Sequence, residues 1–235
     1  MKLKKKVKSL GIIIDGNRRW AVKKGLKKTD GHKYGLDNLL STIEWARELG
    51  IEEVTFYIFS TENWKRKKIE VAALMTLFEK VIKDKLSVLA DNGFEIKFIG
   101  DVKMFSKKLQ KLIFELEKKS KVENGEKKVK VFLAASYGGR NEIINGIKKL
   151  SRELTKKEIE KIDEVKFEKF LYSGVISDPE IIIRTGGDTR LSNFLMWKST
   201  YSELIFLKKL WPDFRKKDLE KILKKYQEAR LQKGK

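Results

Sequence analysis

Four short segments of this sequence combine glycine, arginine and small polar residues in a way that could hold a phosphorylated ligand. They are Asp15-Gly16-Asn17-Arg18-Arg19, residues 60–66, Tyr137-Gly138-Gly139-Arg140 and Arg184-Thr185-Gly186-Gly187-Asp188. Arginine presents a planar fork of donors to phosphate oxygens, glycine allows close backbone approach, and helix amino termini carry free N–H groups. One segment alone is weak evidence, because an Asp-Gly-Asn triplet is usually an ordinary turn. Their recurrence is stronger and predicts a diphosphate-binding rim.

Each segment follows a short apolar run, often β-branched, of the kind typical of a buried strand. The sequence predicts strands at residues 11–14, 54–59, 94–99, 129–135, 180–184 and 204–207. Apolar residues at helical spacing predict helices at residues 31–49, 71–89, 105–119, from 141 onward and 218–231. Strands that alternate with helices favour a mostly parallel sheet with the helices outside it.

The expected fold is therefore α/β, with one domain over residues 1–235 and a mostly parallel central sheet of about six strands flanked by helices. In an open parallel sheet the binding crevice lies beyond the carboxyl ends of the strands, so the four segments should meet at one edge. The chain has neither a Gly-x-x-x-x-Gly-Lys-Ser/Thr sequence nor a Gly-x-Gly-x-x-Gly sequence after a strand. ATP and NAD are accordingly not indicated.

The composition describes a folded protein with a strongly basic surface. Lysine and arginine number 54 against 33 acidic residues, a net charge of +21, while 41% of the residues are hydrophobic. Such a surface attracts diphosphates, nucleic acids and anionic bilayers alike. A basic nucleic-acid-binding protein is thus an alternative from another class. However, the lysines are spread along every predicted helix rather than interleaved with aromatic residues on one face, so no nucleic-acid partner is expected.

The sequence also bears on redox chemistry and location. Cysteine is absent, which excludes disulfides and thiolate metal sites. The apolar run at residues 10–14 is far shorter than a secretory signal requires, and no run approaches the roughly 20 apolar residues of a membrane span. We expect a cytoplasmic protein, with peripheral contact to an anionic membrane as an open question.

A longer set of ordered motifs closely resembles the cis-prenyltransferases, the family typified by undecaprenyl diphosphate synthase. The match runs from about residue 11 to about residue 214. Besides the segments above, the motifs are Gly31-His32-Lys33-Tyr34-Gly35, Phe59-Ser60-Thr61-Glu62-Asn63-Trp64 with Arg66, Arg190-Leu191-Ser192-Asn193-Phe194-Leu195 with Trp197, Tyr201-Ser202-Glu203, and Leu210-Trp211-Pro212-Asp213-Phe214. The two-aspartate clusters of trans-prenyltransferases are missing, which disfavours a trans synthase.

The resemblance implies an enzyme that condenses isopentenyl diphosphate with an allylic diphosphate. The implied primer is farnesyl or geranylgeranyl diphosphate, and the implied product is a long Z-polyprenyl diphosphate such as undecaprenyl diphosphate, which serves as a glycosyl carrier lipid. By similarity Asp15 is the essential carboxylate and binds Mg²⁺, and Glu203 assists the metal. A hydrophobic tunnel, walled partly by the helix at residues 71–89, is implied for the growing chain. A short-chain Z-prenyl diphosphate synthase stays open as an alternative, because sequence does not give the length of a tunnel.

The resemblance assigns the other site residues as well. The allylic diphosphate is expected to contact the backbone or side chains of Gly16, Asn17, Arg18, Arg19, Lys28 and Arg66. Isopentenyl diphosphate is expected at Arg184, Arg190 and Ser192. Further catalytic or substrate-binding residues are His32, Ser60 and Asn63, with Trp20, Glu62 and Trp64 as additional substrate contacts. A lone histidine is more often structural, but the Gly-His-x-x-Gly setting favours a functional one. We expect Trp20 and Trp211 to serve structure, and Trp64 to combine packing with function.

Some residues depart from the family pattern. Asp188 stands where the family usually has Glu, and Lys28 stands where a phosphate-binding Arg is common, which replaces a bidentate fork with a point charge. The family is usually homodimeric, and the aromatic block at residues 197–214 is a plausible contributor to that interface. The segment Arg230-Leu231-Gln232-Lys233-Gly234 loosely resembles a C-terminal Arg-x-Gly element that reaches a neighbouring active site.

Overall fold

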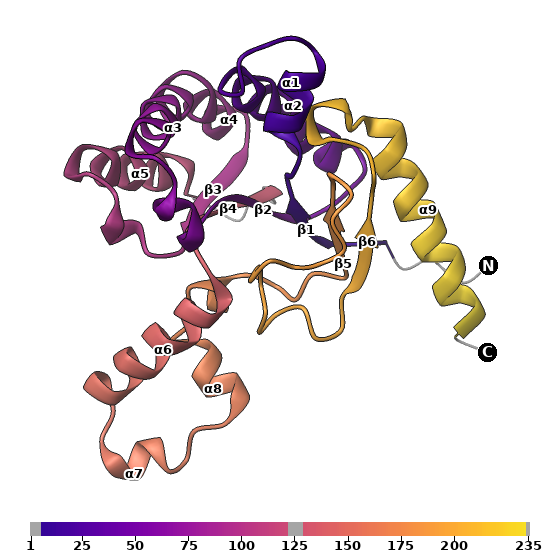
Figure 1. Cartoon of the computed structure of the whole chain (residues 1–235). Helices are drawn as coiled ribbons and strands as arrows, with labels where there is room; N and C mark the ends of the chain where they lie inside the picture. The colour runs from indigo at the N-terminus through magenta and orange to yellow at the C-terminus, as the bar shows by residue number, and fades with distance from the viewer. Residues whose placement is uncertain (1–5, 122–128, 234–235) are drawn as a thin grey trace.

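The central element of the structure, a computed structural model that describes residues 6–121 and 129–233 and side chains up to residue 229, is a parallel sheet (Figure 1). Six strands pair in the order β3-β4-β2-β1-β5-β6, and every pairing is parallel. The strands are β1 (Ser9–Ile13), β2 (Glu53–Ser60), β3 (Phe94–Ile99), β4 (Val129–Tyr137), β5 (Ile181–Arg184) and β6 (Glu203–Phe206). The predicted α/β class and parallel sheet are confirmed.

Helices cover both faces of this sheet. They are α1 (Asn17–Lys23), α2 (Asp30–Glu48), α3 (Lys68–Val81), α4 (Ser87–Asp91), α5 (Lys107–Ser120), α6 (Gly139–Glu153), α7 (Lys156–Ile159), α8 (Glu164–Glu168) and α9 (Lys216–Lys233). Helices α6 to α8 lie on the side of the sheet away from α1 to α5 (Figure 1). Within the described part of the chain, no helix has the length and apolar character to cross a bilayer.

The helix predicted at residues 71–89 differs in its details from the observed one. It begins earlier, at Lys68, and a π-helical turn (Ile82–Leu86) joins α3 to α4. A π turn holds one extra residue, and here Ile82 and Leu86 within the turn and Leu89 after it are all buried. Apolar steps of three or four fit a plain helix and this interrupted one equally, so the sequence pattern could not reveal the turn. Similarly, the Lys/Glu-rich stretch at residues 154–169 contains the short helices α7 and α8.

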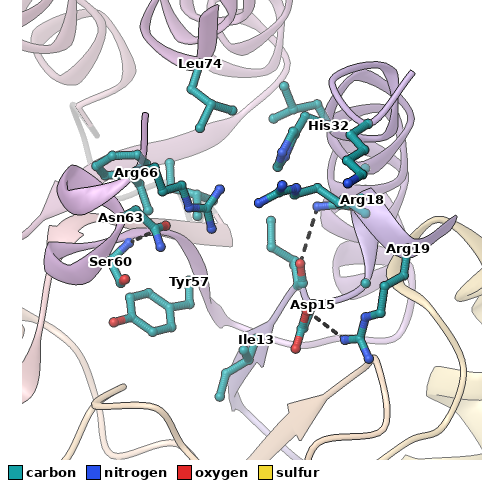
Figure 2. Close-up of a pocket in the computed structure, with 18 of the residues that line it drawn as sticks. Ile13, Asp15, Arg18, Arg19, His32, Tyr57, Ser60, Asn63, Arg66 and Leu74 are labelled. Carbon is teal, nitrogen blue, oxygen red and sulfur yellow. Dashed lines mark hydrogen bonds and ion pairs between the residues drawn. The ribbon is translucent and has the colours of Figure 1, made fainter. Parts of the chain in front are cut away.

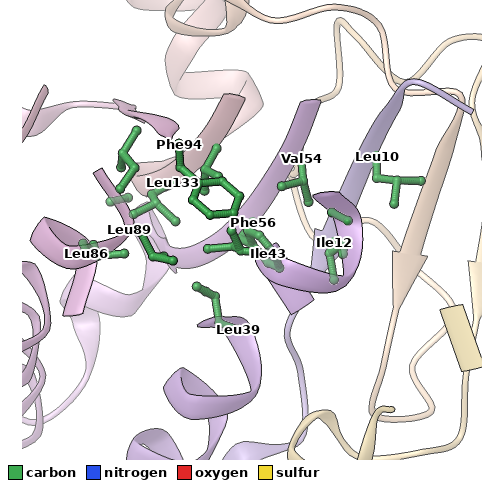
Figure 3. Packing of buried hydrophobic residues seen from close by; sticks show 14 of the residues in the cluster. Leu10, Ile12, Leu39, Ile43, Val54, Phe56, Leu86, Leu89, Phe94 and Leu133 are labelled. Atoms are coloured by element: carbon green, nitrogen blue, oxygen red, sulfur yellow. The ribbon is translucent and has the colours of Figure 1, made fainter. Parts of the chain in front are cut away.

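Two apolar layers hold the sheet between its helices. On one face, Leu10, Ile12, Val54 and Phe56 of the strands meet Leu39 and Ile43 of α2, with Leu86 and Leu89 close by (Figure 3). On the other face, residues of the same strands pack against the segment at residues 191–197, chiefly Phe194 and Leu195. Because these strands are buried on both faces, their sequences are continuous apolar runs and do not alternate between apolar and polar residues.

Trp211 connects this core to the carboxyl edge of the sheet. Its indole is fully buried and stacks on Phe214 at 5.5 Å between ring centroids. The indole N–H donates to the carbonyl of Gly35 at 2.7 Å, and the Asn38 amide donates to the Trp211 carbonyl at 2.7 Å. The Trp211 N–H in turn donates to the carbonyl of Asp15 at 3.0 Å. Trp211 therefore fixes α2 against the loop that follows β1, in the structural role expected for it.

Replacing Trp211 by alanine should strongly destabilise the protein. We expect Trp211→Ala to lower the free energy of unfolding by about 3–5 kcal/mol, because it opens a cavity and leaves the Gly35 carbonyl without its donor. Urea unfolding followed by circular dichroism measures this. Trp197→Ala is the matched control, since Trp197 is only partly buried against Phe167 and should cost clearly less. Equal losses in the two variants would contradict the assignment.

Candidate active site

A cavity of about 760 Å³ opens beyond the carboxyl ends of β1 and β2. Its polar end is lined by predicted site residues, namely Asp15, Gly16, Asn17, Arg18, Arg19, Lys28, His32, Ser60, Asn63, Arg66, Arg184 and Ser192. Its other end is apolar and includes Leu36, Leu74 and Phe78. Figure 2 shows Arg18 and Arg66 reaching toward each other across this cavity, with Asp15 and Arg19 at one side. Residues from three of the four predicted segments thus line one cavity beside an apolar space, whereas none of Tyr137, Gly138, Gly139 and Arg140 lines it.

Asp15 lies between two guanidinium groups. One carboxylate oxygen is 3.1 Å from Arg19 and the other is 2.9 Å from Arg184. The backbone carbonyl of Asp15 is also held, because it accepts from the Thr185 hydroxyl at 2.8 Å. About one third of the Asp15 side chain is exposed, so the carboxylate is oriented by its partners but open to a ligand.

Arg184 is buried and connects Asp15 to the segment at residues 188–192. Its Nη1 donates to the Ser192 hydroxyl at 2.6 Å, and its Nη2 is 3.0 Å from Asp188. The same oxygen of Asp188 is 2.7 Å from Arg190, whose side chain is 65% exposed. Despite being shorter than the family's usual Glu, Asp188 therefore reaches both arginines. Arg190 stands at the outer edge of this cluster and is not among the cavity-lining residues.

A third carboxylate joins Arg18 to Arg66, the two arginines that face each other across the cavity. Glu70, near the start of α3, lies 3.2 Å from Arg18 and 3.1 Å from Arg66. Sequence reasoning missed Glu70. Its spacing four residues after Arg66, at the start of a predicted helix, was the available signal.

His32 is partly buried and lies near this group (Figure 2). Its Nε2 has no hydrogen-bond partner among the described residues. Burial, helped by the positive charges of Arg66 and Arg18 and opposed by Glu70, lowers the pKa of His32 to about 4. The imidazole is consequently neutral at physiological pH. A neutral ring can donate or accept a hydrogen bond without adding to the local charge.

The turn after β2 brings Ser60 and Asn63 together. The Ser60 N–H donates to the Asn63 side chain at 3.1 Å, and the Ser60 side chain accepts from the Asn63 backbone, which forms a capping box for the turn Thr61–Lys65. Trp64 donates from its indole to the Ser136 hydroxyl at 2.9 Å and packs against Phe59, which lines the cavity, whereas Trp64 itself does not. Its packing role is therefore visible in the structure.

The side chains of Glu62 and Trp20 form hydrogen bonds with residues outside the cavity lining. Glu62 accepts from Asn193 at 3.0 Å. Burial opposes ionisation of Glu62, but hydrogen bonds from its backbone and from Asn193 outweigh it and lower its pKa. The Trp20 indole donates to Asp213 at 2.8 Å and the ring lies 4.8 Å from Tyr34. Neither residue is among those that line the cavity.

Close packing of α1 on α2 depends on two glycines. A Cβ at Gly31 would lie 2.0 Å from the Asn17 carbonyl oxygen, and a Cβ at Gly35 would lie 2.2 Å from the Asn17 Oδ1. Asn17 itself donates to the carbonyl of Ile14 at 3.4 Å, and its Oδ1 has no partner among the described residues. The Gly-His-x-x-Gly motif thus sets the distance between His32 and the loop after β1.

The donor set at Asp15 fits magnesium in a particular way. Among the described residues there is no group of three or more histidines or carboxylates that could hold a metal alone. Mg²⁺ commonly binds through one or two carboxylates together with substrate phosphates, and Asp15 in an arginine-rich rim matches that pattern. Glu203, the second predicted ligand, is level with Ile181 at the start of β5, whereas Arg184 at the end of β5 is level with Phe206. Within one chain Glu203 does not lie beside Asp15, and its role stays a prediction.

The C-terminal Arg-x-Gly element predicted at residues 230–234 stays a prediction. Gly234 and the side chains of residues 230–233 lie outside the described part of the structure.

The described residues provide a set of arginines on two sides of Asp15, with an apolar cavity behind them. Such a site can bind two phosphorylated groups at once and shelter an apolar chain.

Comparison with known proteins points to one family. A family model described as undecaprenyl diphosphate synthase matches residues 13–234. The chain is 39% identical to a ditrans,polycis-undecaprenyl-diphosphate synthase ((2E,6E)-farnesyl-diphosphate specific) of Buchnera aphidicola, over 92% of this chain and 87% of that protein. It is 40% identical to a tritrans,polycis-undecaprenyl-diphosphate synthase (geranylgeranyl-diphosphate specific) of Picrophilus torridus, over 96% and 89%.

A solved structure is similar over nearly the whole chain. Lavandulyl diphosphate synthase from Lavandula x intermedia, in complex with dimethylallyl diphosphate, superposes with a TM-score of 0.86. Its sequence is 32% identical, and the match covers 94% of this chain and 95% of that one.

The lowered pKa of the partly buried His32 should make stability depend on pH. In the unfolded chain the histidine takes up a proton near pH 6.5, whereas in the folded chain the pKa is about 4. The free energy of unfolding should therefore fall as pH drops below 6.5, by about 2 kcal/mol at pH 5, and this contribution should level off below pH 4.

Comparison with His32→Gln isolates this effect, because the carboxylates titrate alike in both proteins. We expect urea unfolding at pH 7 and pH 5 to give a steeper loss for the wild type. Parallel pH profiles for the two proteins would show that His32 is solvated or already charged.

Proposed function

Since the chain belongs to the cis-prenyltransferase family and is an isoprenyl transferase, we propose that it condenses isopentenyl diphosphate with farnesyl or geranylgeranyl diphosphate and builds a long Z-polyprenyl diphosphate. Undecaprenyl diphosphate, a glycosyl carrier lipid, is the product we favour. The observation that carries the proposal is the position of Asp15, held between Arg19 and Arg184 at the mouth of an apolar cavity.

In the proposed reaction the two diphosphates bind on either side of Asp15. The allylic diphosphate faces Arg18, Arg19 and Arg66, with Lys28 at the same wall. Isopentenyl diphosphate faces Arg184, Ser192 and the exposed Arg190. The allylic C–O bond breaks with its electrons leaving on the diphosphate, the homoallylic alkene forms the new C–C bond, and a proton leaves the adjacent carbon.

The side chains contribute mainly by placing charge and excluding water. Preoriented arginines stabilise the negative charge that develops on the leaving diphosphate without needing to reorganise. Mg²⁺, which Asp15 would hold with the diphosphate, would add positive charge at the same place when bound. Ser60, Asn63 and the neutral His32 orient the reacting groups and offer hydrogen bonds at the cavity wall.

Growth of the product needs an apolar space behind the rim. The main cavity supplies Leu36, Ile58 and Phe78, and the same three residues also border a small second void lined only by apolar residues. We propose that these spaces form the tunnel for the growing chain. The relatives named above differ in primer, and the similar solved structure is a lavandulyl diphosphate synthase in complex with dimethylallyl diphosphate, so a short-chain Z-prenyl diphosphate synthase is the second candidate.

Partners beyond the substrates are also proposals. Edge strand β6, the turn before it and helix α6 carry exposed apolar side chains, among them Leu204, Tyr201, Ile144 and Ile147, which support a homodimer. Exposed lysines beside the cavity mouth, near the exposed Val22 and Ile69, support peripheral contact of a cytoplasmic enzyme with an anionic membrane.

Chromatography of radiolabelled products tests the proposed function. The protein is incubated with Mg²⁺, radiolabelled isopentenyl diphosphate and either farnesyl or geranylgeranyl diphosphate, and the products are resolved by length. We expect long Z-products from the wild type, and Asp15→Asn should reduce turnover by roughly a hundredfold to a thousandfold. Products of a single addition would favour the short-chain enzyme, whereas normal turnover by a folded Asp15→Asn protein would refute the role of Asp15.

Arg190 allows a test of the second substrate site without disturbing the core, because its side chain is largely exposed. Arg190→Ala should raise KM for isopentenyl diphosphate roughly tenfold to a hundredfold, as loss of a charged hydrogen bond does, while KM for the allylic primer changes little. Arg152→Ala, which removes an exposed arginine of α6, is the control. An effect confined to the allylic primer would assign Arg190 to the other site.

A further inference from the structure

Asn193 joins three loops at the carboxyl edge of the sheet. Its side-chain oxygen accepts from the N–H of Arg140 at 2.8 Å, and its backbone carbonyl accepts from the N–H of Gly139 at 2.7 Å. Its side-chain nitrogen donates to Glu62 at 3.0 Å. Asn193 therefore connects its own loop to the beginning of α6 and to the turn after β2.

The contact with α6 is a helix cap supplied from a distant part of the chain. The residue at the N-cap, Gly138, has no side chain, so the first N–H groups of α6 lack a local acceptor. Asn193, which follows Arg140 by 53 positions, supplies both acceptors. A Cβ at Gly138 would lie 2.5 Å from the Thr61 hydroxyl and 2.8 Å from the Asn193 amide nitrogen, so a side chain there would displace these groups.

The backbone at Asn193 and at its neighbour Ser192 is left-handed. Ser192 has φ 49° and Asn193 has φ 68°. Asparagine visits this region more readily than most residues, whereas serine needs support from its surroundings. The Ser192 hydroxyl accepts from Arg184 at 2.6 Å, and its carbonyl accepts from the Tyr57 hydroxyl at 3.3 Å. The three bonds of Asn193 thus hold the adjacent Ser192 in an unusual conformation at the cavity wall.

We propose that Asn193 is a positioning residue for the isopentenyl diphosphate site. It acts through Ser192, whose hydroxyl it keeps beside Arg184, and through Glu62, whose turn carries Ser60 and Asn63. The inference rests on the proposed function, because it assumes that Ser192 and Arg184 receive the second diphosphate. It adds a residue that touches neither substrate but sets where one of them binds.

Asn193→Gly is the main test, because glycine tolerates the positive φ while removing both side-chain hydrogen bonds. We expect KM for isopentenyl diphosphate to rise roughly tenfold, as for loss of about one to two hydrogen bonds, with KM for the allylic primer changing less than about twofold. Ser106→Ala is the matched control, because Ser106 caps α5 through Leu109 at 3.2 Å, away from the cavity. Ser106→Ala should lower the melting temperature about as much as Asn193→Gly does, and it should leave KM unchanged for both isopentenyl diphosphate and the allylic primer.

Asn193→Asp separates the two side-chain contacts. The carboxylate still accepts from the Arg140 N–H but faces Glu62 with like charge. We expect this variant to be impaired as well, and the addition of Glu62→Gln to restore KM to the value of Glu62→Gln alone, since the new amide can donate to the carboxylate. Failure of this restoration would remove Glu62 from the proposal.

A binding measurement keeps the inference apart from the proposed function. Isothermal calorimetry with isopentenyl diphosphate alone should show weaker binding to Asn193→Gly than to the wild type, whether or not product forms. A wild type that binds isopentenyl diphosphate but makes no product would contradict the proposed function and leave the inference about Asn193 standing. Equal affinity and equal KM in the two proteins, with only the melting temperature lowered, would make Asn193 a structural cap and overturn the inference.

Discussion

The site depends on carboxylates that each hold two arginines. Asp15 bridges Arg19 and Arg184, Asp188 bridges Arg184 and Arg190, and Glu70 bridges Arg18 and Arg66. Guanidinium groups gathered so closely would repel one another and lose their orientation without these partners. Each carboxylate supplies negative charge where a phosphate would otherwise supply it. The rim is therefore stable as it stands, with donors already directed toward the cavity.

The parallel sheet explains why this rim and an apolar cavity lie side by side. The carboxyl ends of β1, β2 and β5 deliver Asp15, Ser60 and Arg184 to one edge, while α2 and α3 lean over the same edge with apolar residues. Leu36 and Phe78 border the cavity and also the small void behind it. One architecture thus offers charge for a diphosphate and an apolar surface for a hydrocarbon chain attached to it.

Much of this arrangement could be predicted from the sequence, because strands buried on both faces and polar segments at their ends are local patterns. The class, the parallel sheet and the meeting of Asp15, Arg66 and Arg184 at one cavity agree with expectation. Contacts made between distant segments carry no local signal. The cap that Asn193 gives to α6 is of this kind. So are the hydrogen bond between Glu62 and Asn193 and the one between Trp20 and Asp213. Whether each residue touches substrate in the predicted way stays a prediction, and for Glu203 the strand register argues that one chain alone does not bring it to Asp15.

The pairing of β1 with β5 has a consequence for how the enzyme is made. Asp15 and Arg184 are 169 residues apart in the chain, and β1 cannot complete its pairing in the sheet until β5 has been synthesised. Closing so long a loop is entropically costly, and folds dominated by such contacts form slowly. The reaction centre therefore cannot be completed before β5 is made, and a nascent chain that ends before β5 holds Asp15 without the Arg184 guanidinium that orients it.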